Sequence, residues 1–213
     1  MKTEWIEYPD IAGLYPKLGI EATSRRANGD PYYTLPVIHD PNTGATISES
    51  FAIAQYLDKT YPQTPVLIPK GTAAFHAAFI RWYGFNVSNH VHDIAVAAVC
   101  KILPERSAEF FRTTREANHG KKLEDVLGDT EWQAAETGFT QLNKFLSANG
   151  AGADELVMGD QVSFADIQIA STLMWVKRSL GENSEEWKRV SGWNGGKWKR
   201  IVDRLSPYEV IDL

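Results

Sequence analysis

Residues 33–57 read YTLPVIHDPNTGATISESFAIAQYL, and this stretch decides the fold. Pro36 lies near the start of a short apolar run, and the pair Glu49-Ser50 directly precedes a run with helical periodicity. Between them, residues 40–44 have the composition of a tight hairpin turn. The stretch therefore predicts a strand, a turn, a return strand and a helix in immediate succession.

The two ends of this stretch have complementary chemistry. A bond to proline adopts the cis form at modest cost, and a cis bond after Leu35 would turn its backbone N–H and C=O outward, where an extended peptide can pair with them. A helix N-terminus attracts a carboxylate, the Ser50 hydroxyl adds a donor, and Glu49 can hold an ammonium group. Together they predict a site for a small peptide with a free amino-acid head, the form that glutathione has.

Each feature also has a simpler interpretation. Ser50 could be an ordinary residue at a helix start, and a proline such as Pro36 in an edge strand commonly blocks aggregation. It is the combination, in which Leu-Pro-Val is followed by a tight turn, a strand and Glu-Ser at a helix start, that favours the binding site.

Composition excludes several classes of protein. The chain has 213 residues, a net charge of −5 and a single cysteine, Cys100. The negative charge argues against a nucleic-acid or membrane-surface binder, and no apolar run approaches the ~20 residues of a membrane span. The residues MKTEWIEYPD place charges where a signal peptide needs an apolar stretch, so a cytoplasmic location is expected.

The chain divides into a mixed α/β part and a helical part. The expected elements of the first part are a strand at 3–8, a helix at 9–19, strands at 32–39 and 45–48, and a helix at 50–60. Residues 61–71 hold three prolines and a glycine, which indicates a linker. We therefore predict a domain over 1–62, a linker over 63–71 and an all-helical domain over 72–213. Within the latter, Thr130-Glu131-Trp132-Gln133 and Ser163-Phe164-Ala165-Asp166 have the spacing of helix-capping boxes.

These motifs resemble those of the glutathione S-transferase superfamily. Its N-terminal, thioredoxin-like domain has a cis-proline before the third strand and a Glu-Ser or Asp-Ser at the third helix, as in Leu35-Pro36 and Glu49-Ser50. Its helical domain has a Gly-x-x-Ser/Thr-x-x-Asp capping motif, which residues 159–166, GDQVSFAD, match with one extra residue in the spacer. The segments KTEWIEYPDI, YTLPVIHDP and FFRTTRE are similar to fungal etherase-like (FuA) glutathione transferases, which points to a fungal protein.

The resemblance implies an α+β fold and a set of roles. Glutathione would be the co-substrate, with no metal, and Leu35, Pro36, Glu49 and Ser50 would bind it. A cleft for a hydrophobic aromatic co-substrate would border the first helix of the second domain, and a homodimer is implied. That helix carries Phe79, Trp82, Tyr83 and Phe85, for which core packing is the alternative interpretation.

The resemblance also implies that the chain begins at the family's second strand, with Lys2-Thr3-Glu4-Trp5. The thioredoxin-like domain would then be incomplete, without the first strand and helix whose junction carries the thiol-activating Tyr, Ser or Cys. The catalytic residue is accordingly unassigned.

Other reactive side chains have structural interpretations. His90 and His92 are two residues apart and would face different sides of a helix, which predicts no metal site. Cys100 is expected to be a small buried apolar residue. Arg25 and Arg26 could pair with a ligand carboxylate, although a solvated loop is the favoured interpretation.

The sequence therefore predicts a glutathione transferase that conjugates or cleaves glutathione adducts of hydrophobic aromatic compounds, as in detoxification. Two alternatives stay open. One is a carrier of aromatic ligands with the same fold and no turnover. The other is a structural module that binds a protein partner.

Overall fold

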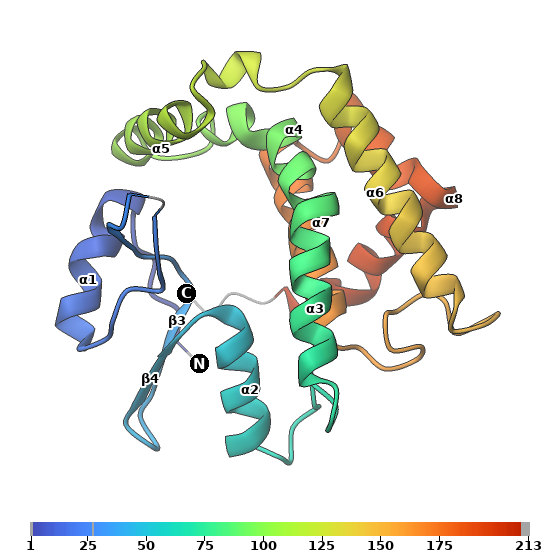
Figure 1. Ribbon diagram of the computed structural model, residues 1–213, viewed down its shortest axis with the longest axis horizontal. Coiled ribbons are helices and arrows are strands. Elements are labelled where there is room, and N and C mark those ends of the chain that lie inside the picture. Colours follow the sequence, from blue (N-terminus) through green and yellow to red (C-terminus); the bar gives the residue numbers. More distant parts are fainter. Residues whose placement is uncertain (1, 27, 210–213) are drawn as a thin grey trace. The chain divides into compact units, whose positions relative to one another are not determined.

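The computed structural model describes residues 2–26 and 28–209 (Figure 1). They form two compact units, residues 2–68 and residues 69–209. The division between the units falls inside the predicted linker, residues 63–71. The first unit is a small mixed α/β domain with few strands and the second is helical, as the sequence predicts.

The first unit is built from short elements. After a 3₁₀ turn at Tyr8–Asp10, these are α1 (Ile11–Leu18), β1 (Ser24–Arg25), β2 (Pro31–Tyr32), β3 (Val37–Asp40), β4 (Ala45–Ser48) and α2 (Ser50–Thr60). The strands form two antiparallel pairs, β1 with β2 and β3 with β4.

The β3–β4 hairpin follows from its turn residues. Asp40 pairs with Ala45 and Val37 with Ser48, so the turn occupies the predicted positions 41–44. Gly44 has a φ of 74° and donates its N–H to the Asp40 carbonyl at 2.8 Å. This left-handed conformation favours glycine, and it returns the chain directly into β4.

Two strand predictions in this unit are wrong. Residues 2–7 form no strand, and Trp5 is 68% exposed, because the described chain offers this segment no neighbouring strand. The strand predicted over residues 32–39 is interrupted at residues 33–36, where Pro36 has no N–H to donate to a ladder. Strand β3 begins immediately after it.

The helical unit contains longer elements. They are α3 (Ala73–Tyr83), a π-helical turn (Gly84–Ser88), α4 (Asn89–Val99), α5 (Glu105–His119), a 3₁₀ turn (Leu123–Asp125), α6 (Asp129–Ser147), α7 (Phe164–Leu180) and α8 (Glu185–Leu205). The α7 helix packs against α3, α4 and α8, and α6 packs against α4 and α8 (Figure 1). No helix in the described ranges has the length and apolar character that crossing a membrane requires.

Two particular packing features hold this unit together. A Cβ at Gly138 of α6 would lie 1.9 Å from the Asn86 carbonyl oxygen, so only glycine allows α6 to approach the π-helical turn this closely. Near the end of the chain, α8 is kinked at residues 193–196, where Asn194 has a φ of 50°. The Trp198 indole donates to the Asn194 side chain at 2.8 Å across this kink.

The two predicted capping boxes have different outcomes. At α7, the Asp166 carboxylate accepts from the Ser163 N–H at 2.9 Å and from the Ser163 hydroxyl at 2.7 Å, as predicted. At α6, the box is displaced by two residues: Gly128 is the N-cap, and its N–H donates to Glu131 at 2.9 Å. The prediction of Thr130 as the cap is wrong because glycine, too, adopts the extended N-cap conformation.

Candidate functional site

The loop before β3 presents an accessible backbone. The Leu35-Pro36 bond is cis, and both residues are exposed. In the described part of the chain, neither the Leu35 backbone nor the Ser50 hydroxyl has a hydrogen-bond partner. These are two of the polar groups that the sequence assigns to a peptide ligand, and both are available to one.

Thr34 connects this loop to α1 and to the start of α2. The Tyr15 hydroxyl, which is fully buried, donates to the Thr34 carbonyl and lies 2.8 Å from the Thr23 hydroxyl. The Thr34 N–H donates to the Thr23 hydroxyl at 3.2 Å. The Thr34 hydroxyl in turn donates to the Glu49 carboxylate at 3.2 Å. The site residues predicted at the two ends of residues 33–57 are therefore brought together in one unit.

Glu49 has an unusual backbone conformation. Its φ is 74° and its ψ is 118°, and within the described ranges only one other non-glycine residue, Asn194, has a positive φ. This region costs of order 1–3 kcal/mol for a residue with a side chain, and such residues cluster at functional sites. The Glu49 carbonyl still accepts from the Ile53 N–H at 2.8 Å, so α2 begins immediately after the strained residue.

Asp40 fixes the hairpin against α2. Its carboxylate accepts hydrogen bonds from the hydroxyls of Tyr56 at 2.6 Å and Tyr61 at 2.5 Å, and from the Asn42 N–H at 2.9 Å. These bonds lower the pKa of Asp40 to about 2, and the bond from Tyr56 contributes most. Sequence reasoning missed this anchor, because spacing patterns do not show that tyrosines 16 and 21 positions further along reach back to a turn aspartate.

The four aromatic residues predicted at a co-substrate cleft belong to the helical unit. Phe79 and Tyr83 are buried in its core with rings almost parallel and 5.8 Å apart, and burial raises the pKa of the Tyr83 hydroxyl. Phe85 is 55% exposed and Trp82 is half-buried. Only Trp82 and Phe85 therefore offer appreciable surface to a ligand.

The two arginines predicted as possible partners of a ligand carboxylate have local contacts. Arg25 donates to the Gly29 carbonyl at 3.0 Å, and the Arg26 guanidinium lies 4.7 Å from the centre of the Tyr32 ring. These contacts fit the loop interpretation. In the helical unit, by contrast, His92, Asp93 and His119 come together in an arrangement that could hold a metal ion.

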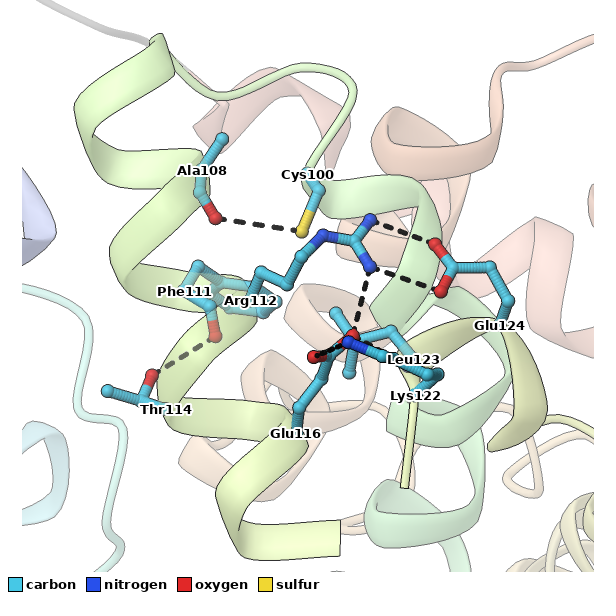
Figure 2. Close-up of polar contacts among 9 residues, drawn as sticks. All are labelled: Cys100, Ala108, Phe111, Arg112, Thr114, Glu116, Lys122, Leu123 and Glu124. Atoms are coloured by element: carbon cyan, nitrogen blue, oxygen red, sulfur yellow. Dashed lines mark hydrogen bonds and ion pairs between the residues drawn. The ribbon is translucent and has the colours of Figure 1, made fainter. Parts of the chain in front are cut away.

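Cys100 shows no sign of activation. Figure 2 shows its thiol directed at the Ala108 carbonyl, 3.9 Å away. The side chain is half-buried, and burial raises the thiol pKa, so that the neutral form predominates near neutral pH. This cysteine does not supply a nucleophile.

Arg112 forms the ion pairs that Figure 2 shows beside Cys100. It pairs with Glu116 at 3.1 Å and with Glu124 at 2.8 Å, and the latter contact lowers the pKa of Glu124. Because Glu124 lies in the 3₁₀ turn that follows α5, the network fixes that turn to the helix and has a structural role.

Two family models match the chain. One, described as the C-terminal domain of glutathione S-transferase, matches residues 74–208, and the other, described as the N-terminal domain, matches residues 19–65. The chain therefore belongs to the glutathione S-transferase family.

Solved structures and a curated relative agree with this assignment. Glutathione transferase GSTFuA3 of Phanerochaete chrysosporium is 47% identical, with a TM-score of 0.96 over 100% of this chain and 85% of that one. CsGST63524 of Ceriporiopsis subvermispora, solved in complex with glutathione, is 48% identical, with a TM-score of 0.94 over 99% and 85%. The glutathione S-transferase-like protein ustS of Aspergillus flavus is 26% identical over 91% of this chain and 73% of its own length.

Proposed function

We propose that this protein is a cytoplasmic, homodimeric fungal glutathione transferase, acting in detoxification, that transfers glutathione to hydrophobic aromatic compounds or cleaves their glutathione adducts. The observation that carries the proposal is the Thr34–Glu49 hydrogen bond, which joins the Leu35-Pro36 loop to the start of α2. The complex of a 48% identical relative with glutathione supports the choice of ligand.

The γ-glutamyl and cysteinyl parts of glutathione have matching groups in the first unit. The free N–H and C=O of Leu35 suit the cysteinyl peptide unit, whose pairing is strand-like. The Ser50 hydroxyl and the positive end of α2 suit the γ-glutamyl carboxylate, and Glu49 suits its ammonium group. We assign no side chain to activation of the glutathione thiol.

A carrier without turnover is the second candidate. It is favoured by the engagement of the Tyr15 hydroxyl, which is buried and bonded to Thr23 and Thr34 and so is not free to activate a thiol. Such a carrier would not depend on glutathione for binding. It would bind aromatic compounds at the exposed surface of Trp82 and Phe85.

The test is retention of the full chain on immobilised glutathione, followed by a conjugation assay with an activated aryl halide. Ser50→Ala should lose retention, whereas Ser171→Ala, which removes an exposed hydroxyl of α7, should not. Retention with turnover supports the transferase. Thermal stabilisation by aromatic compounds in the absence of glutathione, without turnover, supports the carrier. A folded chain that is not retained contradicts the transferase and leaves the carrier.

A further inference from the structure

Three potential metal ligands meet where α4 passes the end of α5. His92 and Asp93 lie on α4, and His119 is the last residue of α5. The His92 Nδ1 atom lies 3.2 Å from the Asp93 carboxylate oxygen, and the His119 Nε2 atom lies 3.8 Å from the same oxygen. One donor atom from each of the three residues lies within 4.8 Å of the others.

These separations are close to those of a coordinated ion. Zinc binds imidazole nitrogen and carboxylate oxygen at ~2.0–2.1 Å, which places neighbouring donors of a tetrahedron about 3.3 Å apart. The observed 3.2 Å and 3.8 Å bracket that value. The donors of His92 and His119 lie within 4.8 Å of each other, so the two rings need only turn toward Asp93 for all three donors to reach one ion.

The site is accessible yet ordered. The side chains of His92, Asp93 and His119 are 35%, 25% and 23% exposed, so an ion can reach them from solvent. The His92 ring lies almost parallel to the Trp175 ring of α7, at 7° and 5.6 Å, and to the His119 ring, at 15° and 6.1 Å. Ring packing thus limits the orientations of His92 before any ion arrives.

The end of α5 determines where His119 lies. Gly120, with a φ of 67°, caps the helix, and its N–H donates to the Glu116 carbonyl at 2.8 Å. This cap stops the helix immediately after His119. The sequence-based prediction of no metal site considered only His90 and His92. It could not anticipate His119, which lies 27 positions after His92 on another helix.

We propose that His92, Asp93 and His119 bind one divalent transition-metal ion of the zinc type. Two neutral imidazoles and one carboxylate suit Zn²⁺, Ni²⁺, Co²⁺ and Cu²⁺ better than Mg²⁺ or Ca²⁺, which favour oxygen ligands. Three protein donors leave at least one coordination position for water or an exogenous ligand. The bound ion links α4 to the end of α5, and this proposal is independent of the glutathione site.

The test is calorimetric titration of the metal-stripped, tag-free full chain with Zn²⁺ in a non-coordinating buffer. One ion should bind per chain. His119→Gln and Asp93→Asn should each weaken binding by at least tenfold, whereas His90→Gln, which alters the neighbouring histidine of α4, should leave it unchanged. Each variant should retain the helical circular dichroism spectrum of the wild type.

Trp175 provides a second readout that locates the ion. Ni²⁺ should quench part of the tryptophan fluorescence, and Trp175→Phe, which keeps an aromatic ring beside His92, should remove that part. The proposal is overturned if the wild type binds no Zn²⁺, if His119→Gln and Asp93→Asn bind as well as the wild type, or if His90→Gln loses binding equally. In the first two cases, the cluster is only two histidines beside one carboxylate, to which His92 is hydrogen-bonded.

Discussion

The Thr34 hydroxyl donates to the Glu49 carboxylate at 3.2 Å, although 14 residues separate the two along the chain. This bond connects the loop that contains the cis Leu35-Pro36 bond with the strained residue that directly precedes α2. It sets the spacing between the two halves of the proposed glutathione site.

Thr34→Val should weaken glutathione binding by about threefold to tenfold, because it removes one hydrogen bond to a charged group at an exposed position. The valine keeps the shape of the side chain. Thr46→Val, which removes a hydroxyl of β4 that lies 3.0 Å from His39, is the matched control. Equal affinities for Thr34→Val and the control, measured by titration, would show that Glu49 needs no support from Thr34.

Asp40→Asn should destabilise the first unit in a pH-dependent way. The pKa of Asp40 is lowered from 3.8 to about 2 in the folded protein, so its carboxylate contributes stability that is fully present above pH ~4 and is lost as the pH falls through 2. The free energy of unfolding in urea should therefore differ between wild type and variant by an amount that is constant at pH 5–7 and becomes smaller below pH 4. A difference in unfolding free energy that is the same at pH 2.5 and pH 6 would contradict the stabilising role of the ionised Asp40. The exposed Asp30→Asn is the control.

Gly138→Ala should destabilise the helical unit by about 3 kcal/mol or more, because the new Cβ would overlap the Asn86 carbonyl and separate α6 from the π-helical turn. Gly13→Ala is the matched control, since Gly13 lies inside α1 and no atom lies within 4 Å of the position that the new methyl group would occupy. It should stabilise the protein by about 0.5–1 kcal/mol. Chemical denaturation measures both changes, and a Gly138→Ala variant as stable as the wild type would contradict the close approach.

Asp166→Ala should cost about 3 kcal/mol of unfolding free energy. It leaves the buried Ser163 N–H and hydroxyl, and the Val157 N–H, without their acceptor. Glu131→Ala breaks the equivalent but more exposed bond at the start of α6 and should cost only about 1 kcal/mol. Similar losses for the two variants would mean that burial does not determine the strength of these capping boxes.

Local chemistry made β4 and α2 predictable. Their turn residues at 40–44, the proline at 36 and the Glu-Ser pair all act on the backbone within a few positions, so the strand at 45–48 and the helix at 50–60 are correct to the residue. The strand predicted at 3–8 failed for the opposite reason. A strand needs a partner, and pairing cannot be deduced from one alternating segment.

The contacts that assemble the sites were beyond sequence reasoning. The bonds from Tyr56 and Tyr61 to Asp40, and the approach of His119 to Asp93, join residues that are 16 to 26 positions apart. Spacing patterns reveal only neighbours on one helix or strand. The cis Leu35-Pro36 bond and the start of α2 at Ser50 could be predicted because each is a backbone feature that its own neighbours in the sequence produce.

The most direct test of the account is calorimetric titration of the full chain with reduced glutathione, with Glu49→Gln and Ser50→Ala as variants. The account predicts saturable binding by the wild type and a loss of at least tenfold in affinity in each variant, with the helical spectrum unchanged. Wild-type affinity in both variants, or no binding by the folded wild type, would contradict the claim that the start of α2 holds the γ-glutamyl group.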